Sequence, residues 1–221
     1  IMWIFATRGR VENCKRLIEH WNKTRASTEV YVRLDDCDEY LEELKLLSWP
    51  SSFEIHIGPR EGLRAALNEG FKNYPNKNWY GLLADDLVPR TNNWDQKLVD
   101  RAGLKEISYP NDLGGKPRLP THPVVGGDLV RAVGWFGFPN ANHLYLDTAW
   151  KAIGDRLKCL HRLDDVIVEH VHPFWKKTSS DIIYKENKTR SVNDKQQYEE
   201  WIKNDVEILV SLLKKEGFGN V

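Results

Sequence analysis

Short apolar runs of strand length alternate with segments of helical periodicity through about the first hundred residues of the chain. In the first pair, the apolar run from Met2 to Phe5 precedes "VENCKRLIEHW", in which apolar residues recur on one helical face. The runs "EVYVRL", "FEIHI" and "WYGLLA" are each followed by a similar segment, namely "EYLEELKLL", "GLRAALNEGF" and "NWDQKLVDRA". Four such pairs predict the α/β class, with a mostly parallel central sheet flanked by helices.

The second half of the chain is less regular. Gly and Pro are frequent between Ile107 and Asn142, so we expect an irregular, functional loop system there. Its aromatic residues Trp135, Phe136 and Phe138 are candidates for stacking on a sugar or a base. The remaining elements are a helix in "HLYLDTAWKAIGDRL", a strand in "DDVIVEHVHP" and a capped amphipathic helix in "DKQQYEEWIKNDVEILVSLLKKEG".

Composition limits the class of protein. The 221 residues suffice for about one domain, and 41% hydrophobic and 29% charged residues are ordinary for a soluble folded protein. Lys plus Arg and Asp plus Glu both total 32, so the overall charge gives no attraction to nucleic acid or to membranes. The apolar runs are too short for a membrane span. Three widely spaced cysteines and the absence of a signal-peptide pattern lead us to expect a reducing cytoplasm.

Polar sequences follow each of the first four expected strands. They are "TRGR" from Thr7, "DDCD" from Asp35, "GPREG" from Gly58 and the pair Asp85 and Asp86. Ligands of open α/β sheets bind at the carboxyl ends of the strands, where these four sequences meet. Adjacent carboxylates there can hold a hard divalent cation, which commonly bridges to phosphate oxygens. The alternative is a turn with a helix cap, because Asp favours both places.

Two histidines follow the last expected strand. In an extended chain His170 and His172 point to the same face, so both can look into one cleft and one of them can complete a metal site. The alternative is that each is a hydrogen-bonded structural residue.

The ordered set "IFATRGR", "VRLDD", "GPREGLRAALNEG", "LLADD", "YLDTAW" and "DVIVEHVHP" resembles the metal-dependent glycosyltransferases of the GT-A fold, particularly the family 2-like enzymes that use nucleotide-diphospho sugars. The resemblance spans nearly the whole chain. It implies one GT-A (Rossmann-like) domain over 1–221, with an irregular acceptor-side insertion and a C-terminal helix. Within it, 1–103 would bind the nucleotide sugar, 104–175 would hold the acceptor and catalytic groups, and 176–221 would form a mobile basic loop and the C-terminal helix.

The same resemblance assigns roles at the donor site. Asp86 is the preferred ligand of Mn or Mg, with a contribution from His170 or His172, while Asp85 lies nearer the ribose or the donor sugar. Leu83 stands where a strict DxD motif has its first Asp, which leaves the division of labour between the two acids open. The residues expected near the nucleotide and diphosphate are Thr7, Arg8, Arg10, Asp35 or Asp36, Arg60, Arg64 and, in a loop that closes over the diphosphate, Lys176 and Lys177. For that loop, a solvated polar linker is the alternative.

Transfer of a sugar to a hydroxyl needs a base opposite the leaving group. Asp147 is the first candidate, since it opens a helix after the irregular segment and resembles the lone Asp that several relatives place there. It can also be read as a first-turn acid stabilised by the helix dipole. Asp165, in the doublet with Asp164, is the rival. A direct displacement with one base inverts the anomeric configuration.

The leading expectation is therefore a cytoplasmic, metal-dependent glycosyltransferase, with a UDP-sugar as the favoured donor. The acceptor would be a glycan or a hydroxymethylated nucleobase in DNA, since relatives that resemble this compact chain include viral enzymes; the location would then be the host cytoplasm. Two other classes are weighed against it. A sugar-nucleotide nucleotidyltransferase usually opens with a Gly-rich basic signature, which "ATRGRVENCKR" lacks. A non-catalytic nucleotide or nucleic-acid binding module would not need carboxylates and histidines to converge on a metal.

Overall fold

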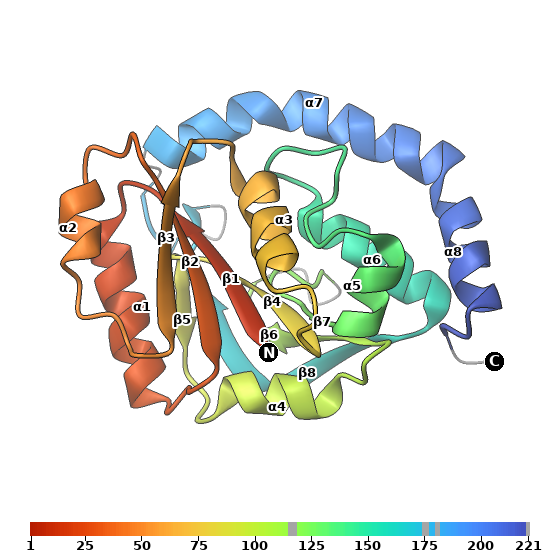
Figure 1. The fold of residues 1–221 in the computed structure, drawn as a ribbon, viewed down its shortest axis with the longest axis horizontal. Coiled ribbons are helices and arrows are strands. Elements are labelled where there is room, and N and C mark those ends of the chain that lie inside the picture. Colours follow the sequence, from red (N-terminus) through yellow and green to blue (C-terminus); the bar gives the residue numbers. More distant parts are fainter. Residues whose placement is uncertain (115–118, 174–176, 180–181, 220–221) are drawn as a thin grey trace.

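The computed structural model describes residues 1–114, 119–173, 177–179 and 182–219, and these form an α/β structure around one sheet (Figure 1). The strands are β1 (Met2–Thr7), β2 (Glu29–Asp35), β3 (Phe53–Gly58), β4 (Trp79–Leu83), β5 (Leu87–Pro89), β6 (Ile107–Asn111), β7 (Val124–Gly126) and β8 (Leu160–His170). The helices are α1 (Val11–Lys23), α2 (Leu41–Lys45), α3 (Leu63–Asn73), α4 (Trp94–Arg101), α5 (Gly127–Val133), α6 (Leu146–Leu157), α7 (Ile182–Asn204) and α8 (Val206–Lys215).

The described strands form one sheet in the order β3-β2-β1-β4-β7-β6-β8-β5. The first four in this order are parallel, so their carboxyl ends lie at one edge. Strand β7 runs antiparallel to both β4 and β6, β8 pairs parallel with β6, and β5 is antiparallel to β8. The predicted mostly parallel sheet and the four strand and helix pairs of the first half are confirmed.

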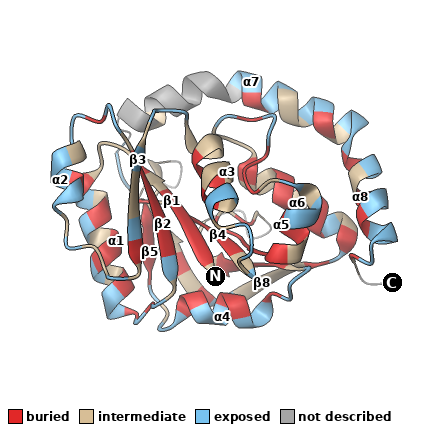
Figure 2. Cartoon of the chain, in the orientation of Figure 1, coloured by how far each residue is buried: buried red, intermediate tan, exposed pale blue. Residues whose placement is uncertain are grey.

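The sheet is buried on both faces, as the residues of β1 illustrate (Figure 2). Met2 and Ile4 pack into one apolar cluster, which α3, α5, α6 and α8 cover, whereas Trp3 and Phe5 pack into the opposite cluster under α1, α2 and α4. Side chains alternate between the two faces of a strand, so a continuous apolar run is needed where both faces are covered. This explains why β1 and β4 read as unbroken apolar runs.

The segment between Ile107 and Asn142 is more regular than its composition indicates, because it contains β6, β7 and α5. Phe136 and Phe138 are fully buried and pack against aromatic residues of α6 and α7, so they are core residues and their predicted stacking role is wrong. Gly137 permits this packing, since a Cβ there would lie 2.7 Å from the Arg64 carbonyl oxygen on α3. Glycine here serves close packing rather than a loop.

The C-terminal segment also differs from the prediction. Helix α7 begins at Ile182, within the stretch expected to be a basic loop, and it is separated from α8 at Asp205. Figure 1 shows α7 crossing above the carboxyl ends of the parallel strands. Among the helices of the described ranges, none has both the length and the apolar character that crossing a bilayer requires.

Replacement of Gly81 by Ala should destabilise the fold. Gly81 lies in β4, and a Cβ there would be 2.3 Å from Cε3 of the buried Trp3. We expect Gly81→Ala to lower the free energy of unfolding by about 1–3 kcal/mol, the usual cost of overpacking a core, measured by urea denaturation. Gly103→Ala is the control, because its Cβ would meet only the movable carboxylate of Glu106. Equal stability of the two variants would contradict the assigned packing of Trp3.

Candidate functional site

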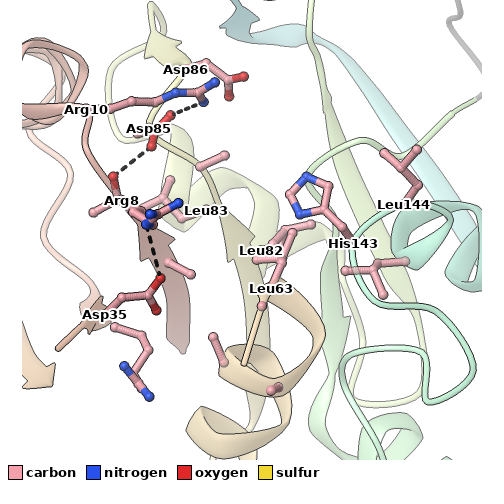
Figure 3. A pocket seen from close by; sticks show the side chains of 18 of the residues that line it. Arg8, Arg10, Asp35, Leu63, Leu82, Leu83, Asp85, Asp86, His143 and Leu144 are labelled. Atoms are coloured by element: carbon pink, nitrogen blue, oxygen red, sulfur yellow. Dashed lines mark hydrogen bonds and ion pairs between the residues drawn. The ribbon is translucent and has the colours of Figure 1, made fainter. Parts of the chain in front are cut away.

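A cavity of about 820 Å³ opens at the carboxyl ends of the parallel strands (Figure 3). Its walls come from the loops after β1, β2, β3 and β4, from the start of α6, from the end of β8 and from α7. This is the edge at which the sequence places a ligand site. Ten of the predicted site residues line it: Thr7, Arg8, Arg10, Asp35, Arg60, Asp85, Asp86, Asp147, His170 and His172.

Four other predicted residues do not line this cavity. Asp36 is exposed beside Asp35, and Arg64 donates from Nη1 to the carbonyl of Pro139 at 2.9 Å. Asp165 is exposed on β8.

The fourth, Lys177, has partners outside the cavity. Its Nζ lies 3.0 Å from Oε1 of Glu169 and 3.4 Å from the carbonyl oxygen of Leu113. Lys176 lies outside the described residues. The described contacts of Lys177 therefore lie outside the cavity.

Asp85 is held by the loop after β1. Its carboxylate accepts hydrogen bonds from Oγ1 of Thr7 at 2.7 Å and from Nη1 of Arg10 at 2.9 Å. Burial raises the pKa of Asp85, the Arg10 guanidinium opposes this, and the adjacent Asp86 raises the pKa further. Both oxygens of Asp85 are thus engaged by protein groups.

Asp86 has a different environment. Its Oδ2 lies 3.2 Å from Nε2 of His170 and accepts a hydrogen bond from the Tyr184 hydroxyl at 2.8 Å. Burial alone would raise the pKa of Asp86, but the charge and hydrogen bond of His170, with a further hydrogen bond from Tyr184, hold this pKa below its usual value. Within the described chain, the buried Oδ1 of Asp86 has no hydrogen-bond partner.

These features fit a divalent cation. Asp86, His170 and His172 each offer a ligand atom, and the three atoms lie within 4.8 Å of one another. A buried carboxylate oxygen without a partner is costly unless a ligand satisfies it. One carboxylate and two imidazoles suit a transition cation such as Mn²⁺ better than Mg²⁺, which prefers oxygen ligands. Since Asp85 is engaged elsewhere, Asp86 is the better placed of the two acids.

His122 lies beside this cluster, although no pattern in the sequence singled it out. Its buried ring meets the His170 ring edge to face, with centroids 4.9 Å apart. Burial, with the neighbouring His170, lowers the pKa of His122 to about 3, so this imidazole is neutral. We infer that it packs behind His170 and fixes its orientation.

The loop after β3 is stabilised by an ion pair of the buried Arg33, which the sequence analysis also missed. Arg33 of β2 donates from Nε to Glu69 of α3 at 2.8 Å. Its other nitrogens donate to the carbonyls of Gly58 at 3.0 Å and Pro59 at 2.8 Å. Arg33 therefore fixes the loop that carries Arg60. Its position in the middle of an apolar run, at "VYVRLDD", was the available signal.

Asp35 lies at the mouth of the same pocket, and Arg8 Nε is 3.9 Å from its Oδ2 (Figure 3). Burial raises the pKa of Asp35, against the lowering effects of Arg33, Arg8 and Arg60. A half-buried carboxylate of this kind can accept hydrogen bonds from a ribose or a base.

Asp147 also lines the cavity, in the first turn of α6. Its Oδ1 accepts hydrogen bonds from the backbone N–H of Thr148 at 2.7 Å and from its hydroxyl at 3.1 Å. Burial raises the pKa of Asp147, and the hydrogen bonds from Thr148 partly offset this rise. A carboxylate with a raised pKa is a stronger base than an ordinary Asp.

The loop before Asp147 is anchored by Asp194 of α7. The buried carboxylate of Asp194 accepts hydrogen bonds from three consecutive backbone N–H groups, those of residues 142, 143 and 144, at 2.9, 3.0 and 2.9 Å. Figure 3 shows the side chains of His143 and Leu144 on this loop, across the cavity from Asp85. Helix α7 thus holds the wall of the cavity that faces Asp85.

No protein-family model matches the sequence, and no curated protein is similar to it. Solved structures are similar. A mannosyltransferase from Pyrobaculum calidifontis, in complex with GDP-Man and Mn²⁺, matches 92% of this chain with a TM-score of 0.66 and 12% identity. GalNAc-T7 with UDP, GalNAc and Mn²⁺ matches 99% with a TM-score of 0.62 and 13% identity. The chain has the GT-A fold.

Glucosyl-3-phosphoglycerate synthase from Mycobacterium tuberculosis, in complex with Mn²⁺, UDP and phosphoglyceric acid, has the same fold, with a TM-score of 0.58, 12% identity and 84% of this chain covered. This chain spans 72% of the length of that synthase, 64% of the mannosyltransferase and 55% of GalNAc-T7. The GT-A chain described here is therefore shorter than these enzymes.

Replacement of Asp194 by Asn should loosen the wall of the cavity. The amide is uncharged and presents one acceptor oxygen in place of two, so all three N–H groups lose a charged acceptor and at least one loses its hydrogen bond. We expect Asp194→Asn to lower the free energy of unfolding by about 1.5–3 kcal/mol in urea denaturation. Asp205→Asn, an exposed acid between α7 and α8, should change it by less than about 0.5 kcal/mol. An unchanged free energy of unfolding in Asp194→Asn would show that the loop is held by other contacts.

Proposed function

We propose that this protein is a metal-dependent glycosyltransferase that moves a sugar from a nucleotide-diphospho sugar to an acceptor hydroxyl. The observation that carries the proposal is the cluster of Asp86, His170 and His172 at the carboxyl edge of a GT-A sheet, with Asp147 lining the same cavity. The proposal is supported by the similar structures, whose complexes contain Mn²⁺ with UDP or GDP-Man.

The nucleotide end of the donor is assigned to the first three loops. Asp35 and Arg60 flank the place for the nucleoside, and Arg8 lies between them and the paired acids. Thr7 and Arg10 act through Asp85, because their hydrogen bonds fix the position of its carboxylate. A UDP-sugar remains the favoured donor.

The diphosphate end is assigned to the metal ligands. Asp86, His170 and His172 would hold the divalent cation, which stabilises the negative charge of a leaving nucleoside diphosphate when bound. Among the described residues, the orphaned Oδ1 of Asp86 is the buried acceptor best placed for it. His122 and Tyr184 fix the ligands rather than bind the ion themselves.

Asp147 is the proposed base. It would accept the proton of the attacking hydroxyl, and a single displacement of this kind inverts the anomeric configuration. Asp165, the rival in the sequence, is exposed and away from the cavity wall. The acceptor is proposed to be a glycan or a hydroxymethylated base in DNA. Of these two the DNA base is less favoured, because a protein of neutral overall charge has little electrostatic attraction to duplex DNA.

Donor and metal should stabilise the protein together. A ligand at a hundred times its dissociation constant adds about 2.7 kcal/mol, so thermal unfolding with UDP, GDP and their sugars, each with and without Mn²⁺, should show a metal-dependent rise in Tm for one nucleotide. Asp86→Asn should abolish the metal-dependent part, because it removes the charged ligand. Asp36→Asn is the matched control, an exposed acid outside the cavity. No shift with any nucleotide in the wild type would contradict the proposal.

Asp147→Asn should remove the catalytic base. The rate is measured with the donor identified above, as the nucleoside diphosphate released when the sugar is transferred to an acceptor or to water. We expect this rate to fall by about a hundredfold or more. Because burial raises the pKa of Asp147 and the base must be ionised, the wild-type rate should decline on the acid side at a higher pH than an ordinary Asp would give. That acid limb should be absent from the variant.

Asp165→Asn provides the comparison, because the two candidate bases compete for one role. Full activity in Asp165→Asn with loss in Asp147→Asn supports the assignment, and the reverse pattern contradicts it. NMR of the product anomer tests the stereochemistry separately, since retention of the donor configuration would exclude a single displacement.

A further inference from the structure

Tyr184 is the one described side chain of α7 that contacts the acidic pair at the end of β4. It lies 98 positions from Asp86 in the sequence, and its hydroxyl donates to Oδ2 of Asp86 at 2.8 Å. Nε2 of His170 lies 3.2 Å from the same oxygen. With Oδ2 engaged in this way, Oδ1 is the atom of Asp86 left for a ligand, and it has no partner in the described chain.

The ring of Tyr184 contacts two more groups at the metal end of the cavity. The Arg10 guanidinium lies over the ring face, with Cζ 4.0 Å from the centroid, while Nη1 of Arg10 donates to Asp85. The edge of the ring meets His172, with centroids 4.6 Å apart. One side chain thus contacts two of the three candidate ligands and the cation that neutralises Asp85.

The contact with Arg10 separates the roles of the two acids. The Arg10 guanidinium lies between the Tyr184 ring and Asp85, so its positive charge compensates Asp85. Asp86 is then the acid proposed to bind the metal. Helix α7 is itself fixed at Asp194, ten residues and about 15 Å further along, to the loop that faces the donor site. Tyr184 is therefore presented from a helix that is anchored independently of the metal cluster.

We propose that Tyr184 is a positioning residue for the divalent cation: its hydroxyl turns Asp86 so that Oδ1 faces the ligand, and its ring holds Arg10 on Asp85. The inference rests on the proposed metal-dependent function and adds to it a residue outside the ligand set. Outer-shell partners of this kind typically change metal affinity by about 10- to 100-fold when removed.

The test measures Mn²⁺ binding by the full chain, from the EPR signal of free Mn²⁺, with Mn²⁺ alone and with UDP or GDP added. Tyr184→Phe removes the hydroxyl and keeps the ring, so the Mn²⁺ dissociation constant should rise about 10-fold while the Tm of the metal-free protein stays unchanged. Tyr184→Ala should weaken nucleotide binding as well, because Arg10 loses its ring contact.

Tyr198→Phe is the matched control. Tyr198 lies on the same helix, and its ring stacks on Tyr145 with centroids 5.0 Å apart, remote from the metal cluster. This variant should bind Mn²⁺ as the wild type does.

The outcomes separate this inference from the proposed function. A wild type that binds Mn²⁺ and a Tyr184→Phe variant that binds it equally well would overturn the role of Tyr184 and leave the proposed function standing. A Tyr184→Phe variant whose metal-free Tm falls together with its Mn²⁺ affinity would also overturn the role of Tyr184, because the loss of affinity would then follow from a loss of structure. A wild type that binds no Mn²⁺, alone or with either nucleotide, would overturn the metal site and this inference together.

Discussion

The burial of two adjacent carboxylates at the end of β4 is the constraint on which the site depends. Asp85 and Asp86 are each 5% exposed, and two neighbouring negative charges in such a place must be compensated by partners from elsewhere in the chain. The partners come from the loop after β1, from the end of β8 and from α7: Thr7, Arg10, His170 and Tyr184. Folding of the chain therefore assembles the cavity, because the carboxylates are satisfied only when these distant segments meet.

The negative charges of Asp85 and Asp86 are compensated by different kinds of partner, and this difference gives the two carboxylates different chemistry. Asp85 receives a permanent charge from Arg10, whereas Asp86 receives an imidazole and a phenol and keeps one oxygen without a described partner. A guanidinium stays charged at any accessible pH, while an imidazole can instead ligate a metal. The environment, and not the order of the two residues in the sequence, is thus the basis for proposing Asp86 as the ligand.

Apolar periodicity predicted the α/β class, the four strand and helix pairs and the edge at which the site lies, because these follow from which faces are buried. It did not predict Arg33, His122 or Tyr184, since each acts through contacts with residues tens of positions away that no local pattern encodes. Gly137, next to Phe136, was read as a sign of a loop, although it serves close packing. Local composition cannot distinguish these two uses of glycine.

Charge balance in the cavity gives a physical reason for the proposed metal dependence. Arg8 is near Asp35, Arg10 is paired with Asp85, and Arg33 is paired with Glu69. Each pair leaves little net positive charge. A His170 that binds a metal is neutral, so Asp86 beside it then adds a negative charge at the place assigned to the diphosphate. Anionic phosphates would meet repulsion from Asp86 at short range, where low dielectric strengthens it. A divalent cation on Asp86 reverses the sign of that potential, so a donor with two phosphates and the cation are expected to bind as a unit.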